Sequence, residues 1–234
     1  MYNNRAKNIT GADKHMIKTI AKFLSYGCLN CGRAVHSKRH VLCSYCESYM
    51  KAFEPNHSHG VISAISYSSS PAKNLIRYMK DYNDPYVFDY AAKIIAQKLK
   101  ELGMTEMLSD FYITYAPRSP LTLLKKRFDQ SKEMADFLAI QLFDDDDGRV
   151  VSLFKRYPFA SEQKSLNSSS RKENAREIFS LKEDVAVPEK ILLIDDLTTT
   201  GSTLFSLRDI LYDAGVKECI LCTLAVNDNN PSYF

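Results

Sequence analysis

The chain has 234 residues, 45% of them hydrophobic, and a formal net charge of +3. This length accommodates one α/β domain with a substantial core and a small additional module. So small a net charge excludes bulk charge as an argument for nucleic-acid or membrane binding, and any basic patch must be local. The apolar run from Met16 to Leu24 contains Lys18 and Lys22, so it is neither a secretory signal nor a membrane span. We therefore expect a cytoplasmic protein that is not embedded in a membrane.

Apolar periodicity and turn residues predict alternating strands and helices. Pro71 and Pro85 are typical of helix starts, and Gly103 and Gly215 are typical of helix ends. In chain order we expect a helix at 13–26, a strand at 61–67, helices from 71 and at 85–102, a strand at 110–117, a helix at 130–143, a strand at 190–196, a helix at 202–214 and a strand at 219–226.

The cysteines form pairs of equal spacing. Cys28, Cys31, Cys43 and Cys46 provide four thiolates in two knuckles, a set that predicts a closed, structural zinc site. Without metal we expect residues 28–46 to be unstructured, because so short a segment buries little apolar surface. The nearby His36 and His40 could also act as ligands, but with four cysteines present they are interpreted as surface residues. Cys219 and Cys222 lie three apart in an expected strand, so they point to opposite faces and are interpreted as core residues.

Three segments have the composition of loops. Turn residues at 54–60 mark a boundary between a module at 1–54 and a domain at 60–234. The acidic run at 144–147 is interpreted as a solvated loop rather than a cation site. Residues 155–173 show little periodicity and predict a long mobile loop, a kind that is often functional.

The stretch "ILLIDDLTTTGST", residues 191–203, combines two carboxylates with a hydroxyl-rich turn. The apolar half suits a strand buried on both faces of a parallel sheet, so Asp195 and Asp196 should emerge at its carboxyl edge, where α/β proteins bind ligands. The turn precedes a helix, whose free N–H groups and dipole would hold a phosphate, while the carboxylates suit sugar hydroxyls. A phosphorylated sugar fits both halves. A buried strand ending in a capping Asp explains one carboxylate, but it explains the pair and the turn poorly.

This stretch resembles the phosphoribosyl pyrophosphate (PRPP) signature of type I phosphoribosyltransferases. By that resemblance, Asp195 and Asp196 contact the ribose hydroxyls, and the residues that hold the 5′-phosphate are Thr199, Thr200, Gly201, Ser202 and Thr203. The chain as a whole resembles the ComF family, whose members pair an N-terminal zinc module with such an α/β domain. The matching pieces are the two cysteine pairs, "RYMKDY", "YAPRS", "FDQS" and "EQKSLNSSSRKENAREIF". Where the family commonly has a glycine, this chain has Arg127, which puts a tight turn there in doubt.

The resemblance implies a glycosyltransferase that transfers a pentosyl group from PRPP, with Mg²⁺, to an acceptor that the sequence does not identify. Arg118, between Pro117 and Ser119, is the candidate for stabilising the pyrophosphate leaving group, the alternative being a solvent-facing arginine. The family's flexible loop corresponds to the segment holding the residues Tyr157, Gln163, Arg171, Lys172 and Asn174. Its cations could face pyrophosphate, nucleic acid or solvent; they are Lys155, Arg156, Lys164, Arg171 and Lys172.

The resemblance also implies a role in importing single-stranded DNA during natural competence, at the inner face of the cytoplasmic membrane through partners. A second hypothesis is a non-enzymatic module that senses PRPP. In that hypothesis the zinc module and the basic run at Lys125, Lys126 and Arg127 contact single-stranded DNA or a competence helicase.

Overall fold

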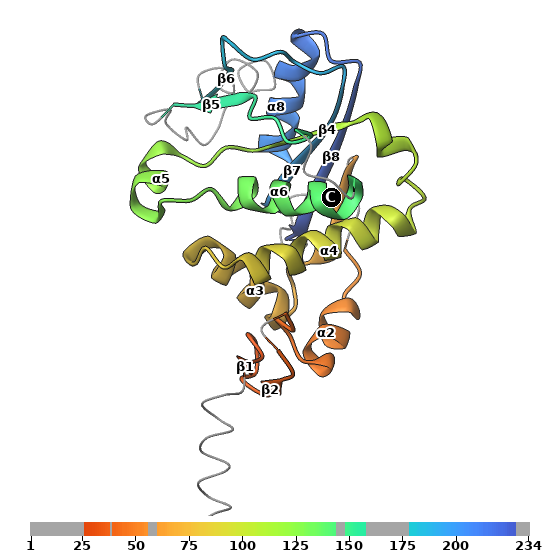
Figure 1. The fold of residues 1–234 in the computed structure, drawn as a ribbon, viewed down its shortest axis with the longest axis vertical. Coiled ribbons are helices and arrows are strands. Elements are labelled where there is room, and N and C mark those ends of the chain that lie inside the picture. Colours follow the sequence, from red (N-terminus) through yellow and green to blue (C-terminus); the bar gives the residue numbers. More distant parts are fainter. Residues whose placement is uncertain (1–25, 38, 56–59, 144–147, 158–177, 228–234) are drawn as a thin grey trace, which may run out of the picture.

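The computed structural model describes residues 26–37, 39–55, 60–143, 148–157 and 178–227 (Figure 1). The expected helix at 13–26 lies outside these residues except for Tyr26, which belongs to a short strand. The acidic run at 144–147 lies outside them too, as do residues 158–177 of the expected loop.

In the part of the chain that the structure describes, four parallel strands form the main sheet, in the order β3-β8-β7-β4. They span Val61–Ser66 (β3), Tyr112–Tyr115 (β4), Lys190–Thr198 (β7) and Glu218–Val226 (β8). The last described strand, β8, therefore lies inside the sheet, between β3 and β7. The α/β class with a parallel sheet is confirmed.

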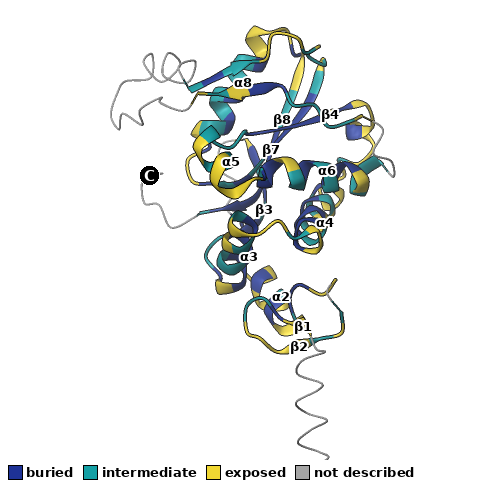
Figure 2. Cartoon of the chain, turned by 60° about the vertical axis from the view of Figure 1, so that its left-hand side comes forward, coloured by how far each residue is buried: buried dark blue, intermediate teal, exposed yellow. Residues whose placement is uncertain are grey.

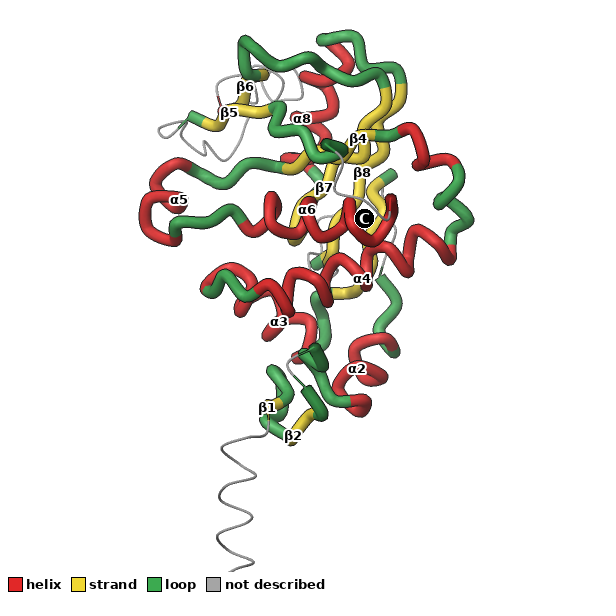
Figure 3. Tube along the Cα trace, viewed as in Figure 1, coloured by secondary structure: helices red, strands yellow, loops and turns green. Residues whose placement is uncertain are grey.

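Helices cover both faces of this sheet (Figures 1 and 3). One face carries α4 (Pro85–Glu101) and α6 (Gln130–Phe143), with α3 (Ser70–Asp81) beside them, and α8 (Ser202–Asp213) covers the other. Residues of β7 alternate between two clusters: Leu192 and Ile194 pack with α4 and α6, and Ile191 and Leu193 with α8. The strand is thus buried on both faces, as its unbroken apolar run predicts. Figure 2 shows this burial along the sheet.

The helix ends follow the expected local chemistry. The Ser69 side chain accepts a hydrogen bond from the N–H of Ala72 at the start of α3, and Asp84 accepts one from the N–H of Tyr86 at the start of α4. Each cap supplies an acceptor to a first-turn N–H group that has no partner inside the helix. Gly103 ends α4 with a φ of +70°, which is the left-handed conformation that glycine adopts without strain.

Cys219 and Cys222 lie on opposite faces of β8, as expected. Cys222 is fully buried in the cluster that includes α4 and α6, while Cys219 packs against the cluster that includes α8. Both thiols have a pKa raised to about 12 by burial. Neither belongs to the four-cysteine group.

Several short elements were not expected. They are β1 (Tyr26–Gly27) and β2 (Ala34–Val35), α2 (Ser44–Lys51), a 3₁₀ turn η1 (Met107–Asp110), α5 (Pro120–Lys126), and the antiparallel pair β5 (Phe154–Arg156) and β6 (Phe179–Leu181). The two strands β1 and β2 and the helix α2 build a small module that sits below α3 in Figure 1.

Candidate functional site

The two carboxylates lie within β7, which extends two residues beyond the expected end at 196. The strand continues through Thr198 because Asp195, Leu197 and Thr198 pair with β8. Asp196 is buried, with 5% of its surface exposed, and Asp195 is half-buried. The Oδ1 of Asp195 accepts hydrogen bonds from the N–H of Asp196 at 2.8 Å and from Oγ of Ser131 at 3.4 Å. The pair therefore faces the first turn of α6.

Two side chains from two different helices contact Asp196. Its Oδ2 accepts a hydrogen bond from Nε2 of Gln130 at 3.2 Å and lies 3.4 Å from Nζ of Lys80. Gln130 begins α6, and Lys80 belongs to the last turn of α3. The Lys80 side chain is 40% exposed while the Asp196 side chain is 7% exposed, so the cation lies on the solvent side of the carboxylate.

Asp195 carries an unfavourable charge. Burial raises the pKa of its carboxyl group well above the ordinary value, and the neighbouring Asp196 carboxylate adds to this shift. Lys80 opposes it by favouring the ionised form. Two adjacent carboxylates in a partly enclosed position are stabilised by a cation or by hydrogen-bond donors, so this pair is suited to a ligand that carries hydroxyl groups or a metal ion.

Arg118 follows β4 and is fixed between α3 and α6. Its Nη2 donates to the carbonyl of Lys80 at 3.1 Å, and its Nη1 donates to the carbonyl of Phe128 at 3.4 Å. Its backbone N–H donates to Oδ2 of Asp129 at 2.9 Å, and its guanidinium lies 5.3 Å from the centre of the Phe128 ring. Burial lowers the pKa of Arg118, and the charges of Asp129 and Asp196 oppose this shift. The structure thus places Arg118 beside the carboxylate pair rather than free in solvent.

Asp129 organises the start of α6. Its Oδ1 accepts from the N–H of Ser131 at 3.1 Å, and its backbone carbonyl accepts from the N–H of Glu133. Burial raises the pKa of its carboxyl group, while hydrogen bonds from backbone N–H groups, first that of Arg118, lower it. This residue caps the helix and holds the Arg118 loop at the same time.

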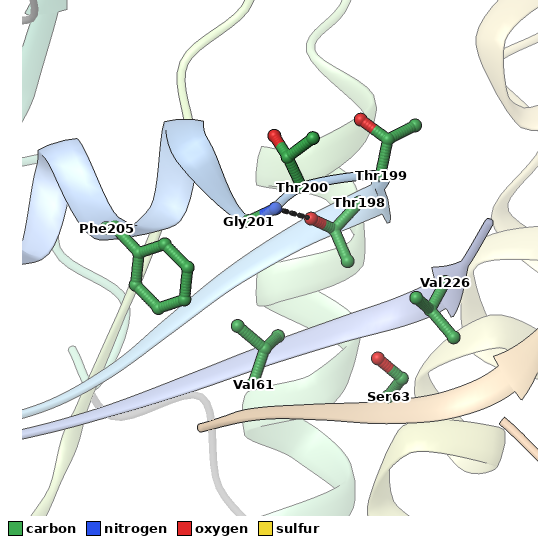
Figure 4. A pocket seen from close by; sticks show the side chains of 8 residues that line it. All are labelled: Val61, Ser63, Thr198, Thr199, Thr200, Gly201, Phe205 and Val226. Carbon is green, nitrogen blue, oxygen red and sulfur yellow. Dashed lines mark hydrogen bonds between the residues drawn. The ribbon is translucent and has the colours of Figure 1, made fainter. Parts of the chain in front are cut away.

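The hydroxyl-rich turn forms the start of α8 and lines a small pocket (Figure 4). Gly201 is the residue before the helix and has a φ of +70°. Its N–H donates to Oγ1 of Thr198 at 2.8 Å, and the N–H of Ser202 donates to Oγ1 of Thr200 at 3.3 Å. We expected free N–H groups at this turn, and these two are satisfied by side-chain oxygens because Thr and Ser hydroxyls readily cap helix starts. The residues lining the pocket are Val61, Ser63, Thr198, Thr199, Thr200, Gly201, Phe205 and Val226.

Arg127, at the position where the family commonly has a glycine, keeps the turn. It follows α5 with a φ of +62°, and among the described residues it is the one residue other than glycine with a positive φ. Its N–H donates to the carbonyl of Leu123 at 2.7 Å. The chain therefore adopts the tight turn without glycine, at a cost in backbone strain.

The N-terminal module brings the four predicted cysteines together. The sulfur atoms of Cys28, Cys31, Cys43 and Cys46 all lie within 4.8 Å of one another, and those of Cys31 and Cys43 are 3.7 Å apart. A tetrahedral zinc ion with bonds of about 2.3 Å holds its sulfur ligands about 3.8 Å apart. This four-cysteine cluster could therefore bind zinc. Gly32, after the first knuckle, has the expected positive φ of 71°.

Hydrogen bonds support the cysteine cluster from outside. Burial raises the pKa of Cys46 to about 12, while Nδ2 of Asn30 donates to its sulfur at 3.2 Å. Burial also acts to raise the pKa of Cys28, but hydrogen bonds from the backbone of Cys31, Cys43 and Asn30 outweigh it and lower that pKa to about 6. Donors of this kind orient and stabilise metal-binding thiolates.

Both histidines of the N-terminal module lie outside the cysteine cluster. His36 and His40 are exposed, as expected, and the Nδ1 of His40 is 2.9 Å from Oγ of Ser37.

Sequence reasoning missed Lys80, Gln130 and Ser131. Lys80 lies in "RYMKDY" and Gln130 and Ser131 lie in "FDQS", two of the pieces that carry the family resemblance. For Gln130 and Ser131 a signal was available in the sequence. Asp129 directly precedes the predicted helix at 130–143 and is a typical capping residue, so the next two side chains lie in the first turn of that helix. Of the expected loop residues, Tyr157 is exposed, with its hydroxyl 3.1 Å from Oγ of Ser180. Lys155 and Arg156, expected in the same loop, instead belong to β5, and Nη1 of Arg156 donates to the carbonyl of Pro117 at 3.5 Å. The remaining loop residues fall outside the described residues: Gln163, Lys164, Arg171, Lys172 and Asn174.

Together the described residues form an α/β protein with a parallel sheet, a polar site at one strand–turn–helix junction, and a small four-cysteine module. No family model matches the chain. It is similar to Competence protein F of Haemophilus influenzae, with 24% identity over 229 residues that cover 87% of this chain and 98% of that protein. It is also similar to Competence protein ComFC of Streptococcus pneumoniae, with 31% identity over 143 residues that cover 60% of each. The resemblance to ComF-type competence proteins, expected from the motifs, is confirmed.

Among solved structures, a hypoxanthine phosphoribosyltransferase from Staphylococcus aureus matches 60% of this chain and 66% of its own, with 15% identity and a TM-score of 0.34. None of the described helices is long and apolar enough to cross a membrane.

Proposed function

We propose that this chain binds phosphoribosyl pyrophosphate with Mg²⁺ at the junction of β7 and α8. One observation carries this proposal. Asp195 and Asp196 lie near the carboxyl end of β7, and the turn at 199–203 follows directly and leads into the start of α8. The carboxylates accept hydrogen bonds from the ribose hydroxyls. The first-turn N–H groups of α8 beyond that of Ser202, the helix dipole and the hydroxyls of the turn bind the 5′-phosphate.

Arg118 serves the pyrophosphate end of the same ligand. Two of its N–H groups are engaged by carbonyl oxygens, and a guanidinium has further donors that suit phosphate oxygens. Lys80 adds a second, partly exposed cation beside Asp196. Mg²⁺ would be held by Asp195 or Asp196 together with ligand oxygens, because it favours a few carboxylates combined with phosphate and water. It would neutralise charge on the pyrophosphate.

A pentosyl transfer is the reaction that such a site would support. The bond between ribose C1 and the pyrophosphate oxygen breaks, the electron pair leaves with pyrophosphate, and an acceptor nucleophile bonds to C1. The developing negative charge lies toward Arg118, which stabilises it by hydrogen bonding. The carboxylates hold the sugar in place while its ring becomes positively charged. None of the described residues identifies the acceptor molecule.

The names of two relatives support a biological role. The Haemophilus and Streptococcus relatives are both named as competence proteins, and we propose that this chain acts in DNA uptake during natural competence. The chain divides into an N-terminal module at 1–54, stabilised by zinc, and an α/β domain at 60–234 that carries the PRPP site.

Calorimetry tests the binding site directly. PRPP with Mg²⁺ is titrated into the wild type, Asp195→Asn, Asp196→Asn and the control Asp184→Asn, which makes the same charge change at an exposed position. We expect binding by the wild type and the control, and a loss of about tenfold or more for each site variant. No heat from the wild type at millimolar PRPP would refute the proposal.

An activity assay distinguishes a transferase from a module that only senses PRPP. Pyrophosphate release is measured with PRPP and a panel of nucleobases. Release that depends on one base and is abolished in Asp195→Asn identifies a transferase, whereas binding without release on any acceptor identifies a PRPP-sensing module.

Exposed cations at the end of α5 favour one further candidate function, binding of single-stranded DNA. Lys125, Lys126 and Arg127 are consecutive and exposed, although Lys126 is also 2.7 Å from Asp81. Contacts with phosphates would make the affinity for an oligonucleotide fall steeply with salt concentration. Replacing Lys125 and Arg127 by Gln should reduce that salt dependence; an unchanged slope would exclude this surface.

A further inference from the structure

Gln130 has one buried polar atom without a partner. The residue is 7% exposed, and its Nε2 donates to Oδ2 of Asp196 at 3.2 Å. Its Oε1 is buried, and none of the described residues donates a hydrogen bond to it. A buried carbonyl oxygen without a donor is costly, and folded proteins rarely keep one without a reason.

The orientation of this amide is fixed by its neighbour. Exchanging the nitrogen and oxygen of Gln130 would place the amide oxygen against the Asp196 carboxylate, where both atoms are acceptors and repel each other. The hydrogen bond to Asp196 therefore fixes Oε1 at a position where none of the described residues donates to it. An apolar side chain at this position would avoid the cost, yet it would leave Asp196 without one of its two supports.

The surroundings indicate what kind of group would satisfy this oxygen. Ser131, the next residue of α6, donates to Asp195, while the ammonium group of Lys80 contacts the same Asp196 oxygen as Gln130 does. The groups in contact with Gln130 and Ser131 are thus two carboxylates, and a cation contacts one of them. Amide and carboxylate oxygens both accept hydrogen bonds, so the group they share must donate. Hydroxyl groups of a sugar meet this requirement, and the cation suits the phosphate of the same molecule.

We propose that Gln130 recognises the sugar of the bound ligand: its Oε1 accepts a hydrogen bond from a ribose hydroxyl, while its Nε2 donates to Asp196. This inference rests on the proposed function, since it assigns a further residue to the same sugar-phosphate site. It makes Gln130 a determinant of specificity, because a ligand with a phosphate but no hydroxyl leaves Oε1 without a donor.

Binding of two small probes tests this role. Ribose 5-phosphate and inorganic phosphate are titrated, with Mg²⁺ present, into the wild type, Gln130→Met and Gln130→Asn. Methionine has a similar length without an acceptor oxygen, and asparagine is one methylene too short to reach both Asp196 and the ligand. The matched control is Gln141→Met, because Gln141 lies on the same helix and donates to Asp89 at 3.1 Å in a similar pair away from the site.

We expect the wild type and Gln141→Met to bind ribose 5-phosphate more tightly than phosphate. In Gln130→Met that preference should fall by about tenfold, which corresponds to one hydrogen bond, while the affinity for phosphate stays the same. Gln130→Asn should show the same direction of change, and it keeps the test valid if the methionine variant does not fold. Thermal unfolding of each variant is measured in parallel.

The outcomes separate the two proposals. A wild type that binds ribose 5-phosphate no better than phosphate refutes the proposed sugar site as a whole. A wild-type preference that survives in both Gln130 variants leaves the sugar site standing and overturns the role of Gln130; its oxygen would then be satisfied by a buried water molecule.

Discussion

Nδ2 of Asn74 donates a 2.9 Å hydrogen bond to Oδ1 of Asn30, and Nδ2 of Asn30 donates to the sulfur of Cys46 at 3.2 Å. Asn74 lies on α3, the helix whose last turn carries Lys80 beside Asp196. One helix therefore contacts the carboxylate pair directly and the cysteine cluster through Asn30. Through it the N-terminal module supports a helix of the candidate site, although no described cysteine lies in that site.

Removing the Asn74 side chain should weaken the metal site from a distance. In Asn74→Ala, Asn30 loses its partner and orients its donor toward Cys46 less well, so we expect zinc affinity to fall by about tenfold. The rate at which a chelator extracts zinc measures the effect, and protease cleavage within 28–46 should follow the loss of metal. The control is Asn83→Ala, an exposed asparagine beyond the end of α3. Equal extraction rates for both variants, or zinc loss without cleavage, would contradict this interpretation.

Gly201→Ala should disrupt the turn at the start of α8 for two reasons. The position has a φ of +70°, and a Cβ atom there would lie 2.6 Å from Cε2 of Phe205. We expect the free energy of unfolding to fall by about 2 kcal/mol or more, together with weaker phosphate binding. Gly103→Ala is the matched control, because Gly103 has the same φ with no atom within 4 Å of the added Cβ. The difference between the two variants in chemical denaturation measures the clash alone, and a difference near zero would show that Phe205 moves aside freely.

Asp195→Asn should stabilise the protein without ligand. Because burial and Asp196 raise the pKa of Asp195, the folded state keeps a proton that the unfolded state releases. The protonated carboxyl group of Asp195 therefore contributes favourably to the free energy of unfolding below the ordinary carboxyl pKa of about 4. This contribution is lost as the pH rises through the raised value. At a pH above the raised value, the charge costs about 1.4 kcal/mol for each unit by which the pKa is raised.

Urea unfolding measured from about pH 4 to pH 8 tests this sign. The advantage of Asp195→Asn over the wild type should grow with pH, while Asp184→Asn, at an exposed position, should show no such trend. An Asn variant that is less stable at neutral pH would mean that the hydrogen bonds from Ser131 and Asp196 outweigh the cost of the charge. The expected result fits a residue kept for binding at the expense of stability.

Local sequence signals determined most of the fold. The apolar run at 191–194 predicted a strand buried on both faces, and Pro71 and Pro85 marked helices that begin within one residue of those positions. Helix α5 was missed because none of its residues is buried, so it carries no apolar stripe facing a core. The pairing of β5 with β6 was missed because short strands that lie far apart in the chain leave no periodic signal.

Apart from Arg118, which the family resemblance indicated, the candidate site was predictable only where its residues are neighbours in sequence. Asp195, Asp196 and the turn at 199–203 form one continuous motif, so the sequence alone brought them together. Gln130 is 66 residues from Asp196, and its contact exists only because α6 packs against β7 with its first turn at the carboxylates. Composition and residue spacing do not show how helices pack on the sheet, so this contact could not be predicted. Lys80 was missed for the same reason.

Arg127→Gly should stabilise the protein, because glycine adopts a φ of +62° without the strain of a side chain. We expect a gain of about 1 kcal/mol in the free energy of unfolding, or about 2–4 °C in Tm. The matched control is Lys125→Gly, two residues earlier inside α5, where the backbone is helical and glycine should cost about 0.5–1 kcal/mol. Opposite signs in thermal unfolding would confirm that the strain is local to Arg127. If both variants lose stability, the Arg127 side chain makes contacts that outweigh its strain. If Arg127→Gly gains stability but binds an oligonucleotide less tightly, the arginine is retained for its charge.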